Sequence, residues 1–196
     1  MLFQETEKNK INTKEEDFLS AAFLETRSIL IFGEINQESA SKICRQLLIL
    51  QHINNDPIYI YLNSQGGHVE AGDTIHDMIR FIKPRVIIVG TGWVASAGIT
   101  IYLSAEKNDR YSLRNTRYMI HQPSGGASGY ASDVKIEADE IIKMRKRINE
   151  LISERTGQSL EQVTKDTDRN FWLTAEESIE YGIVGSIINS IDEIPV

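Results

Sequence analysis

Apolar and polar residues alternate along this chain with two different periods, and each change of period marks an expected element. Apolar residues at three- and four-residue steps predict helices over residues 37–52 and 69–82. Short apolar runs rich in β-branched and aromatic residues predict strands at residues 28–32, 57–62 and 86–90. Strands and helices therefore alternate through the first half of the chain.

The alternation continues beyond this point. A turn of small residues leads into an apolar, helical stretch that reaches about Ala105, and short strands are predicted at residues 111–113 and 117–120. The order β-α-β-α-β-α-β predicts an α/β fold with a mainly parallel sheet and right-handed βαβ crossovers. Ligands of such sheets bind at the carboxyl ends of the strands.

A long helix is predicted from Ser132 to about Arg155. It carries one apolar stripe at helical spacing, formed by Val134, Ala138, Ile141, Met144, Ile148 and Leu151. Such a stripe needs a partner surface, which is either the sheet of the same domain or another subunit. Capping boxes at Ser159 and Thr174 predict the starts of two further helices, and residues 186–188 form a last apolar segment.

The start of the chain has a different composition. Residues 1–16 are polar, charged and poor in aromatic side chains, which is typical of a mobile arm. A capping box at Thr13 predicts a short helix that extends to Phe23. We therefore expect an N-terminal arm with a short helix over residues 1–27 and a single globular domain over residues 28–196.

Charge and cysteine content narrow the classes of protein that fit. The net charge of −7 over 196 residues argues against a nucleic-acid partner. The single cysteine, Cys44, excludes an internal disulfide, and its apolar helical surroundings predict a small core residue. No stretch has the pattern of a signal peptide or a membrane span, so we expect a cytoplasmic protein without a membrane partner.

The stretch Gly92–Gly98 is the strongest candidate for chemistry. It places Ser96 among glycines and alanines, between an expected strand and an expected helix. Few side chains would block a substrate there, and the first amides of a helix are free to bind a developing negative charge. A serine in such a turn also allows close packing, so this stretch alone does not define an active site.

Two further signals lie at the ends of neighbouring strands. His121 follows an apolar strand and precedes a proline, so its ring can project into a cleft. The segment 63–67, Asn-Ser-Gln-Gly-Gly, follows another strand, and its two glycines let the backbone approach a ligand closely. A structural histidine and a simple turn would explain each signal separately. Their joint placement at successive strand ends favours a nucleophilic site.

The sequence of these segments resembles the proteolytic subunits of the Clp protease family, from about Ser28 to Ile188. The resemblance lies in residues 59–67, 95–98, 119–123 with 125–126, 156–162 and 180–184. It implies a crotonase-like fold and a serine endopeptidase that cleaves unfolded proteins and peptides inside a barrel. In this family the barrel is a tetradecamer made of two stacked heptameric rings. An AAA+ ATPase unfoldase of the Clp family delivers unfolded chains into it. The resemblance implies no metal or other cofactor in this subunit, because the ATP is used by the partner ATPase.

The resemblance also assigns roles to residues. Ser96 would be the nucleophile, His121 the base, and the N–H groups of Gly67 and Ala97 the oxyanion hole. Extended substrate would pair with the backbone at His68, Val69, Ser124, Gly125 and Gly126. The long helix from Ser132 would interleave between the rings. Tyr59, Tyr61, Val89, Tyr111 and Leu113 would form docking pockets for the ATPase, although ordinary strand packing explains them nearly as well.

One position departs from the family. Where its members have the catalytic aspartate, this chain has Asn170, and the matching segments on both sides leave no gap in the alignment. An amide can accept a hydrogen bond from the imidazole, but it cannot offset the imidazolium charge. We therefore expect a Ser-His-Asn site with weak intrinsic activity, which needs an activator or a more active paralogue in a mixed barrel. We do not expect Asp168 to replace the missing carboxylate.

Two other functions remain open at this point. A largely non-catalytic ring component that modulates an active paralogue would keep the fold, and Asn170 favours it, whereas Ser96 and His121 oppose it. An acyl-CoA enzyme of the wider crotonase fold would also hold an oxyanion with paired amides. That class relies on carboxylates as acid and base, and the glycine-rich segments here carry none.

Overall fold

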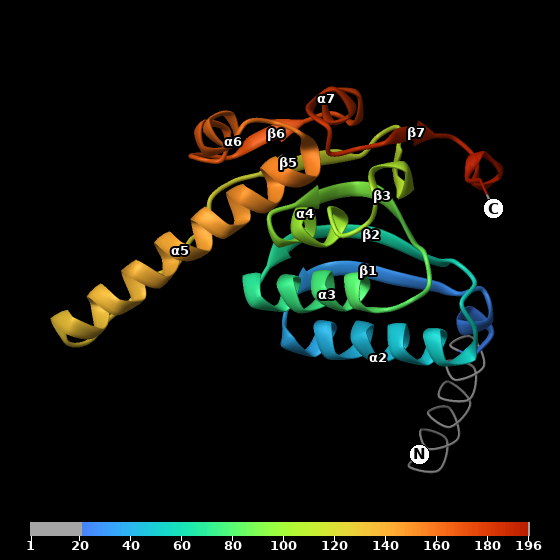
Figure 1. The fold of residues 1–196 in the computed structure, drawn as a ribbon, viewed down its shortest axis with the longest axis horizontal. Helices are drawn as coiled ribbons and strands as arrows, with labels where there is room; N and C mark the ends of the chain where they lie inside the picture. The colour runs from blue at the N-terminus through green and yellow to red at the C-terminus, as the bar shows by residue number, and fades with distance from the viewer. Residues whose placement is uncertain (1–20, 196) are drawn as a thin grey trace, which may run out of the picture.

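The computed structural model describes residues 21–195 (Figure 1). The expected arm and most of the helix predicted from Thr13 lie outside these residues. Residues 21–25 are helical, and they lead into the first strand. No helix within residues 21–195 is long and apolar enough to cross a membrane.

A mainly parallel sheet forms the centre of the described chain, which confirms the predicted α/β class (Figure 1). Its order is β1-β2-β3-β4-β7, with β5 pairing to β3 in parallel and β6 pairing to β5 in antiparallel fashion. The strands are β1 (Ser28–Ile35), β2 (Ile58–Gly67), β3 (Val86–Ala95), β4 (Arg110–Leu113), β5 (Arg117–Ile120), β6 (Phe171–Leu173) and β7 (Ser186–Ile188).

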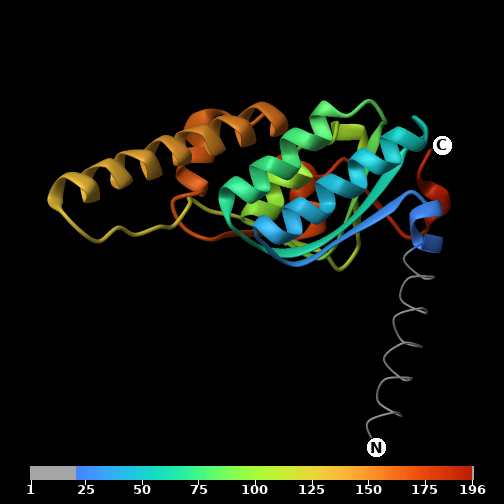
Figure 2. The same ribbon diagram turned by 90° about the horizontal axis from the view of Figure 1, so that it is seen from below.

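Three helices, α2, α3 and α4, cover one face of this sheet, while a long helix extends away from it (Figures 1 and 2). The covering helices and the sheet share the main apolar core. The long helix is α5, and its buried apolar residues, Ile148 and Ile152, lie in its C-terminal half. The helices are α2 (Gln37–Ile53), α3 (Val69–Phe81), α4 (Ala97–Tyr102), α5 (Ala131–Thr156), α6 (Leu160–Asp166) and α7 (Ala175–Tyr181), with short 3₁₀ helices at Lys107–Asp109 and Ile191–Glu193.

Local hydrogen bonds explain where the helices begin. Thr174 accepts from the Glu177 N–H, and Glu177 accepts in return from the Thr174 N–H, so the capping box predicted at α7 is complete. At α6 the prediction is only half right. Ser159 accepts from the Gln162 N–H, but the Gln162 side chain donates to Asp166 instead of reaching back.

Strands β2 and β3 extend further than their apolar runs. The pattern predicts ends at Leu62 and Gly90, whereas the strands continue to Gly67 and Ala95. The β1–β2 register shifts after Phe32 and its partner Asn63, where β2 has one extra residue, and Gly66 and Gly67 then pair with Glu34 and Ile35. The glycine pair therefore prolongs the strand instead of breaking it. The helix after Ser96, expected to reach about Ala105, ends earlier, at Tyr102.

Two arginines tie the C-terminal end of α5 to the domain. The Arg110 side chain is 1% exposed and donates to the carbonyls of Arg155 and Gly182, at the ends of α5 and α7. Arg155 in turn donates to the carbonyls of Leu103 and Ala105, just beyond α4. Burial lowers the pKa of Arg110 to about 10. These bonds anchor one end of α5, so its other end projects.

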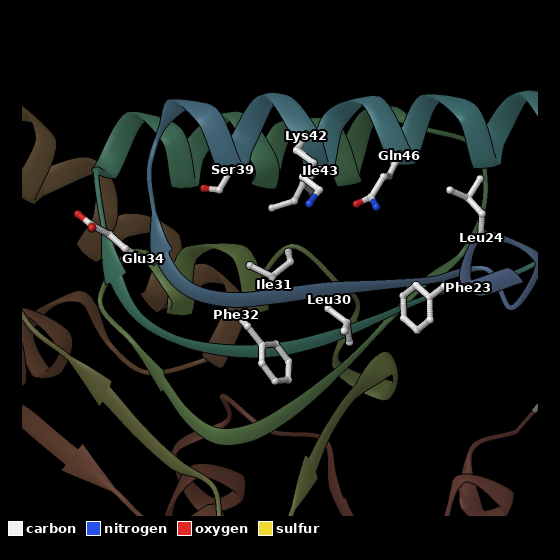
Figure 3. Close-up of a pocket in the computed structure, with 10 residues that line it drawn as sticks. All are labelled: Phe23, Leu24, Leu30, Ile31, Phe32, Glu34, Ser39, Lys42, Ile43 and Gln46. Atoms are coloured by element: carbon white, nitrogen blue, oxygen red, sulfur yellow. The ribbon is translucent and has the colours of Figure 1, made fainter. Parts of the chain in front are cut away.

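A groove of about 610 Å³ lies beside β1 and α2 (Figure 3). Ile31 points from β1 toward α2, whereas Leu30 and Phe32 point to the other side of the strand, as expected from strand alternation (Figure 3). The remaining lining residues are Phe23, Leu24, Glu34, Ser39, Lys42, Ile43 and Gln46. The groove lining includes none of the residues predicted from the sequence to carry chemistry.

Candidate active site

Ser96 lies in a strained turn between β3 and α4. Its φ of +55° is one of two positive values found at non-glycine residues in the described part of the chain. The turn is held by the Ser96 N–H, which donates to the Met119 carbonyl at 3.0 Å, and by the Ile99 N–H, which donates to the Ser96 carbonyl at 2.9 Å. A strained strand-to-helix turn of this kind exposes the serine nucleophile in α/β-hydrolases.

The His121 ring bridges Ser96 and Asn170. Its Nε2 lies 2.8 Å from Ser96 Oγ, and its Nδ1 lies 3.0 Å from Asn170 Oδ1. An amide oxygen can only accept, so Nδ1 carries the ring proton in this arrangement. Nε2 is then left to accept the Ser96 hydroxyl proton, which is the tautomer that a general base requires.

The sheet explains why residues distant in sequence meet here. In the antiparallel β5–β6 pair, Ile120 lies opposite Phe171, so the next residue of one strand, His121, lies beside the preceding residue of the other, Asn170. Asp168 does not take the place of the asparagine, since its carboxylate is 3.2 Å from Arg145 on α5. The structure thus brings together all three residues predicted as catalytic.

A group of hydrogen bonds that no sequence motif indicates holds the segment carrying Asn170. The Gln122 N–H donates to the Thr167 carbonyl at 2.6 Å, and its side chain donates to the Asp168 carbonyl at 2.7 Å. The buried Thr167 hydroxyl donates to Asn149 on α5 at 3.0 Å. The position of Gln122 beside His121 is the only signal in the sequence, and no pattern distinguishes it from a solvent-exposed glutamine.

The glycine pair lies directly against the nucleophile turn. A Cβ built on Gly66 would come 2.6 Å from Ser96 Cβ and 3.1 Å from the Ala97 nitrogen. Gly67, with φ of +152°, lies against Ile35, whose carbonyl accepts from the His68 N–H at 2.8 Å. Ala97 is the first residue of α4, so its N–H has no partner four residues back in the helix. The two predicted oxyanion donors thus belong to segments in contact.

A small cavity of about 20 Å³ opens beside Ser96 and His121. Val69, one of the predicted substrate-binding residues, lines it. The other lining residues are Ala97, Ile99, Thr100, Ile120, Pro123, Ile148 and Ile152. Because α5 supplies two of the isoleucines, the position of that helix sets the size of the cavity.

The remaining predicted substrate residues border this site without lining the cavity. His68 is half exposed, and its Nδ1 lies 3.3 Å from the Glu70 carboxylate. Ser124, Gly125 and Gly126 are exposed and follow His121 along the chain. A Cβ on Gly125 would come 2.9 Å from Ile141 Cδ1, so glycine lets this loop approach α5 closely.

An ion pair connects α5 to α3 near these residues. Arg147 donates to both carboxylate oxygens of Asp73, with an Nη1–Oδ1 distance of 2.9 Å. This hydrogen bonding raises the pKa of Arg147 above its usual value. Paired donation of this kind fixes orientation as well as distance. The contact adds a further connection between α5 and the body of the domain.

The residues predicted to dock an ATPase share the sheet face opposite the three covering helices. Val89 and Tyr111 are buried there in a small cluster with Ile87, Ile188 and Ile194, and Tyr59 and Tyr61 pack against its edge. Leu113 is 38% exposed. Burial raises the pKa of the Tyr61 and Tyr111 hydroxyls. The face therefore offers an apolar surface with tyrosines at its rim.

Comparisons with known proteins show what the chain is similar to along most of its length. The family model described as "Clp protease" matches residues 11–191. The ATP-dependent Clp protease proteolytic subunit 3 of Rhizobium etli is 55% identical over 174 residues, which cover 89% of this chain and 90% of that protein. The structure of ClpP1 from Listeria monocytogenes has 64% identity and a TM-score of 0.82, over 90% of this chain and 99% of that one. An asparagine-to-aspartate mutant of the same Listeria protein gives 63% identity and a TM-score of 0.85 over the same shares.

Proposed function

Because the chain belongs to the Clp protease family, we propose that it hydrolyses peptide bonds with Ser96 as the nucleophile and His121 as the general base. The chain is a serine peptidase of the type found as the proteolytic subunit of ATP-dependent Clp proteases. One observation carries the assignment of the residues. Ser96 Oγ, the His121 ring and Asn170 Oδ1 form a continuous hydrogen-bonded series, with distances of 2.8 and 3.0 Å.

Each group would have a defined part in the reaction. Ser96 Oγ attacks the carbonyl carbon of the scissile bond while His121 Nε2 takes the hydroxyl proton. The N–H groups of Gly67 and Ala97 bind the oxyanion of the tetrahedral intermediate. The imidazolium then gives its proton to the departing amine, which leaves an acyl group on Ser96. Water, deprotonated by His121, releases that acyl group and restores the serine.

Asn170 would limit this cycle. It orients the ring and selects the productive tautomer, but its neutral amide does not stabilise the imidazolium. In chymotrypsin-type proteases the corresponding change from aspartate to asparagine costs about 10⁴ in turnover. We therefore propose that the intrinsic peptidase activity is weak. The second candidate function, which Asn170 also favours, is that of a largely non-catalytic ring component.

Substrate would bind as an added strand. His68 and Val69 follow the end of β2, and the exposed loop Ser124–Gly126 follows β5, so an extended peptide between them would cross Ser96. Main-chain hydrogen bonds do the holding in this mode of recognition. Such binding supports loose sequence preference, with side-chain selection left to the cavity beside Ser96.

Membership of the family implies ring assembly and a Clp ATPase partner. We propose two stacked heptameric rings, with the projecting half of α5 packed between them. Tyr130, Ile136 and Ile142 in that region are 82%, 58% and 64% exposed, which supports an apolar contact there. Tyr59, Tyr61, Val89, Tyr111 and Leu113 would dock the ATPase, which uses the ATP, and this subunit would need no cofactor. A more active paralogue in mixed rings would compensate for Asn170.

We expect a preference for small residues before the scissile bond. A cavity of about 20 Å³ is roughly the space of one water molecule and does not admit a leucine or phenylalanine side chain without movement of α5. Peptides that differ only at this position would therefore differ in kcat/KM, with alanine favoured over phenylalanine by about tenfold, which corresponds to about 1.4 kcal/mol. Equal rates for the two peptides would contradict a closed cavity.

A fluorophosphonate probe tests the proposed nucleophile. It should label the wild-type chain and leave Ser96→Ala unlabelled, since only an activated serine reacts at a useful rate. Ser41→Ala is the matched control, because this exposed serine lies on α2, which carries none of the proposed catalytic or substrate-binding residues, and it should not change labelling. Absence of labelling in the wild-type chain at high probe concentration would favour the non-catalytic ring component.

A further inference from the structure

We propose that the Ser64 hydroxyl is a positioning group for the oxyanion hole, an inference that rests on the function proposed for Ser96 and Gly67. Ser64 belongs to the segment Asn63–Gly67, in which the sequence pattern assigns chemistry to the glycines alone. Its side chain is completely buried, and it lies within the register shift between β1 and β2, where residues 63–66 of β2 face residues 32–34 of β1. Four observations support this role.

The first is its place in the sheet. Both neighbours of β2 change register at this point, β1 between Phe32 and Glu34 and β3 between the partners of Leu62 and Ser64. A bulge removes regular ladder hydrogen bonds and leaves backbone groups in need of other partners. Ser64 pairs with Val94 on β3 but has no partner on β1, so on that side the strand is held without its regular ladder.

The second is the pair of bonds its hydroxyl makes. Ser64 Oγ donates to the Gly33 carbonyl on β1 at 2.5 Å and accepts from the Gly66 N–H at 3.0 Å. One hydroxyl thus bonds to a carbonyl of β1 and to an N–H of β2 at the place where the ladder between these strands shifts. It also closes a turn of the side-chain-to-backbone type over residues 64–66, which fixes the direction of the Gly66 amide.

The third is the position of the next residues in the chain. After the shift, Gly66 lies opposite Glu34 and Gly67 opposite Ile35, and the His68 N–H is fixed on the Ile35 carbonyl at 2.8 Å. The peptide that carries the Gly67 N–H, the proposed oxyanion donor, thus lies between two fixed amides. The Gly66 N–H before it is bonded to Ser64 Oγ, and the His68 N–H after it is bonded to the Ile35 carbonyl. Loss of the hydroxyl frees one of these two amides.

The fourth is proximity to the nucleophile turn. A Cβ built on Gly98 would lie 3.5 Å from the Ser64 carbonyl oxygen and 3.7 Å from Ser64 Cβ, so Ser64 packs under the first turn of α4. Gly66 contacts Ser96 and Ala97 directly. A shift of the 64–67 backbone would therefore change the distance between the two proposed donors, while His121 and Asn170 would stay in place.

Ser64→Ala should weaken the stabilisation of the transition state without weakening the binding of the substrate. Ser64→Ala removes the acceptor of a buried N–H, so the Gly66 amide must turn to find another partner. The expected result is a roughly 10- to 100-fold lower kcat and rate of fluorophosphonate labelling, with KM unchanged within about twofold. Affinity for a peptide boronate, whose tetrahedral adduct places an oxygen at the oxyanion position, should fall by a similar factor.

Ser178→Ala is the matched control for this experiment. Ser178 is also completely buried, and its hydroxyl donates to the Thr174 carbonyl at 2.6 Å, in α7. It should lower the thermal unfolding midpoint about as much as Ser64→Ala without changing labelling or boronate affinity by more than about twofold. Ser64→Cys keeps a weaker donor and acceptor but places a larger sulfur where Oγ lies 2.5 Å from the Gly33 carbonyl, so it should fall between wild type and alanine in rate.

The outcomes separate the two proposals. Normal labelling and boronate affinity in a folded Ser64→Ala variant, with the wild type labelled, would overturn the role of Ser64 alone. A rise in KM equal to the fall in kcat/KM would do the same, because it would indicate a general loss of substrate binding. Absence of labelling in the wild-type chain would overturn the proposed function, and this inference with it.

Discussion

Asn170→Asp should raise kcat for peptide hydrolysis by roughly 10²- to 10⁴-fold near neutral pH. The two side chains have the same shape, so the 3.0 Å contact with His121 Nδ1 is expected to remain. What changes is charge. A carboxylate stabilises the imidazolium that forms when Ser96 is deprotonated, and it has no N–H that could present the wrong donor to the ring. Peptide hydrolysis and fluorophosphonate labelling measured side by side would quantify the gain.

Asn108→Asp is the matched control for that experiment. It adds the same charge at an exposed position in the short 3₁₀ helix Lys107–Asp109, which contains none of the proposed catalytic residues. Its rates should stay within about twofold of wild type, because an exposed charge far from the site is screened by solvent. If Asn170→Asp gives no gain, the asparagine is not the limiting defect, and the non-catalytic ring component becomes the stronger candidate.

The sequence predicted the part of the site that depends on regular parallel strands. Ser96 and His121 each follow an apolar run, and the rule that parallel strands end at one edge was enough to bring them together. Asn170 was different. Strand β6 has only three residues, Phe171–Leu173, which is too short for a period-2 pattern to be read. Its antiparallel pairing with β5 could not be inferred from periodicity, so Asn170 was identified only through the family resemblance.

The same limit explains the wrong ends predicted for β2 and β3. Glycines weaken a strand on intrinsic preference, so the pattern along the chain places a break of β2 at Gly66–Gly67. In the structure they continue it, because the β1–β2 register shifts by one residue and lets both glycines pair with β1, while the Ser64 hydroxyl bonds to Gly33 and Gly66 at the shift. A register shift depends on two strands at once, and a pattern along a single strand does not contain it.

Gly66→Ala should lower kcat/KM by roughly 10³-fold or more while leaving the fold intact. The added methyl group would come 2.6 Å from Ser96 Cβ and 2.8 Å from the Ala95 carbonyl oxygen, and neither atom belongs to a flexible side chain that could move away. The nucleophile turn must therefore shift. A displacement of about 1 Å at a reacting group can cost 10² in rate, and here it would separate Ser96 Oγ from His121 and disturb the oxyanion donors together.

Gly157→Ala is the control that separates the effect of the contact between residue 66 and Ser96 from the effect of backbone strain. Gly157 has φ of +83°, close to the +96° of Gly66, yet a Cβ there would meet nothing within 4 Å. Both variants place an alanine in the left-handed region, at a cost of about 1–2 kcal/mol in stability. Thermal unfolding should therefore shift in both, whereas labelling and hydrolysis should fail only in Gly66→Ala. Equal activity in the two variants would mean that the contact between Gly66 and Ser96 does not control the nucleophile.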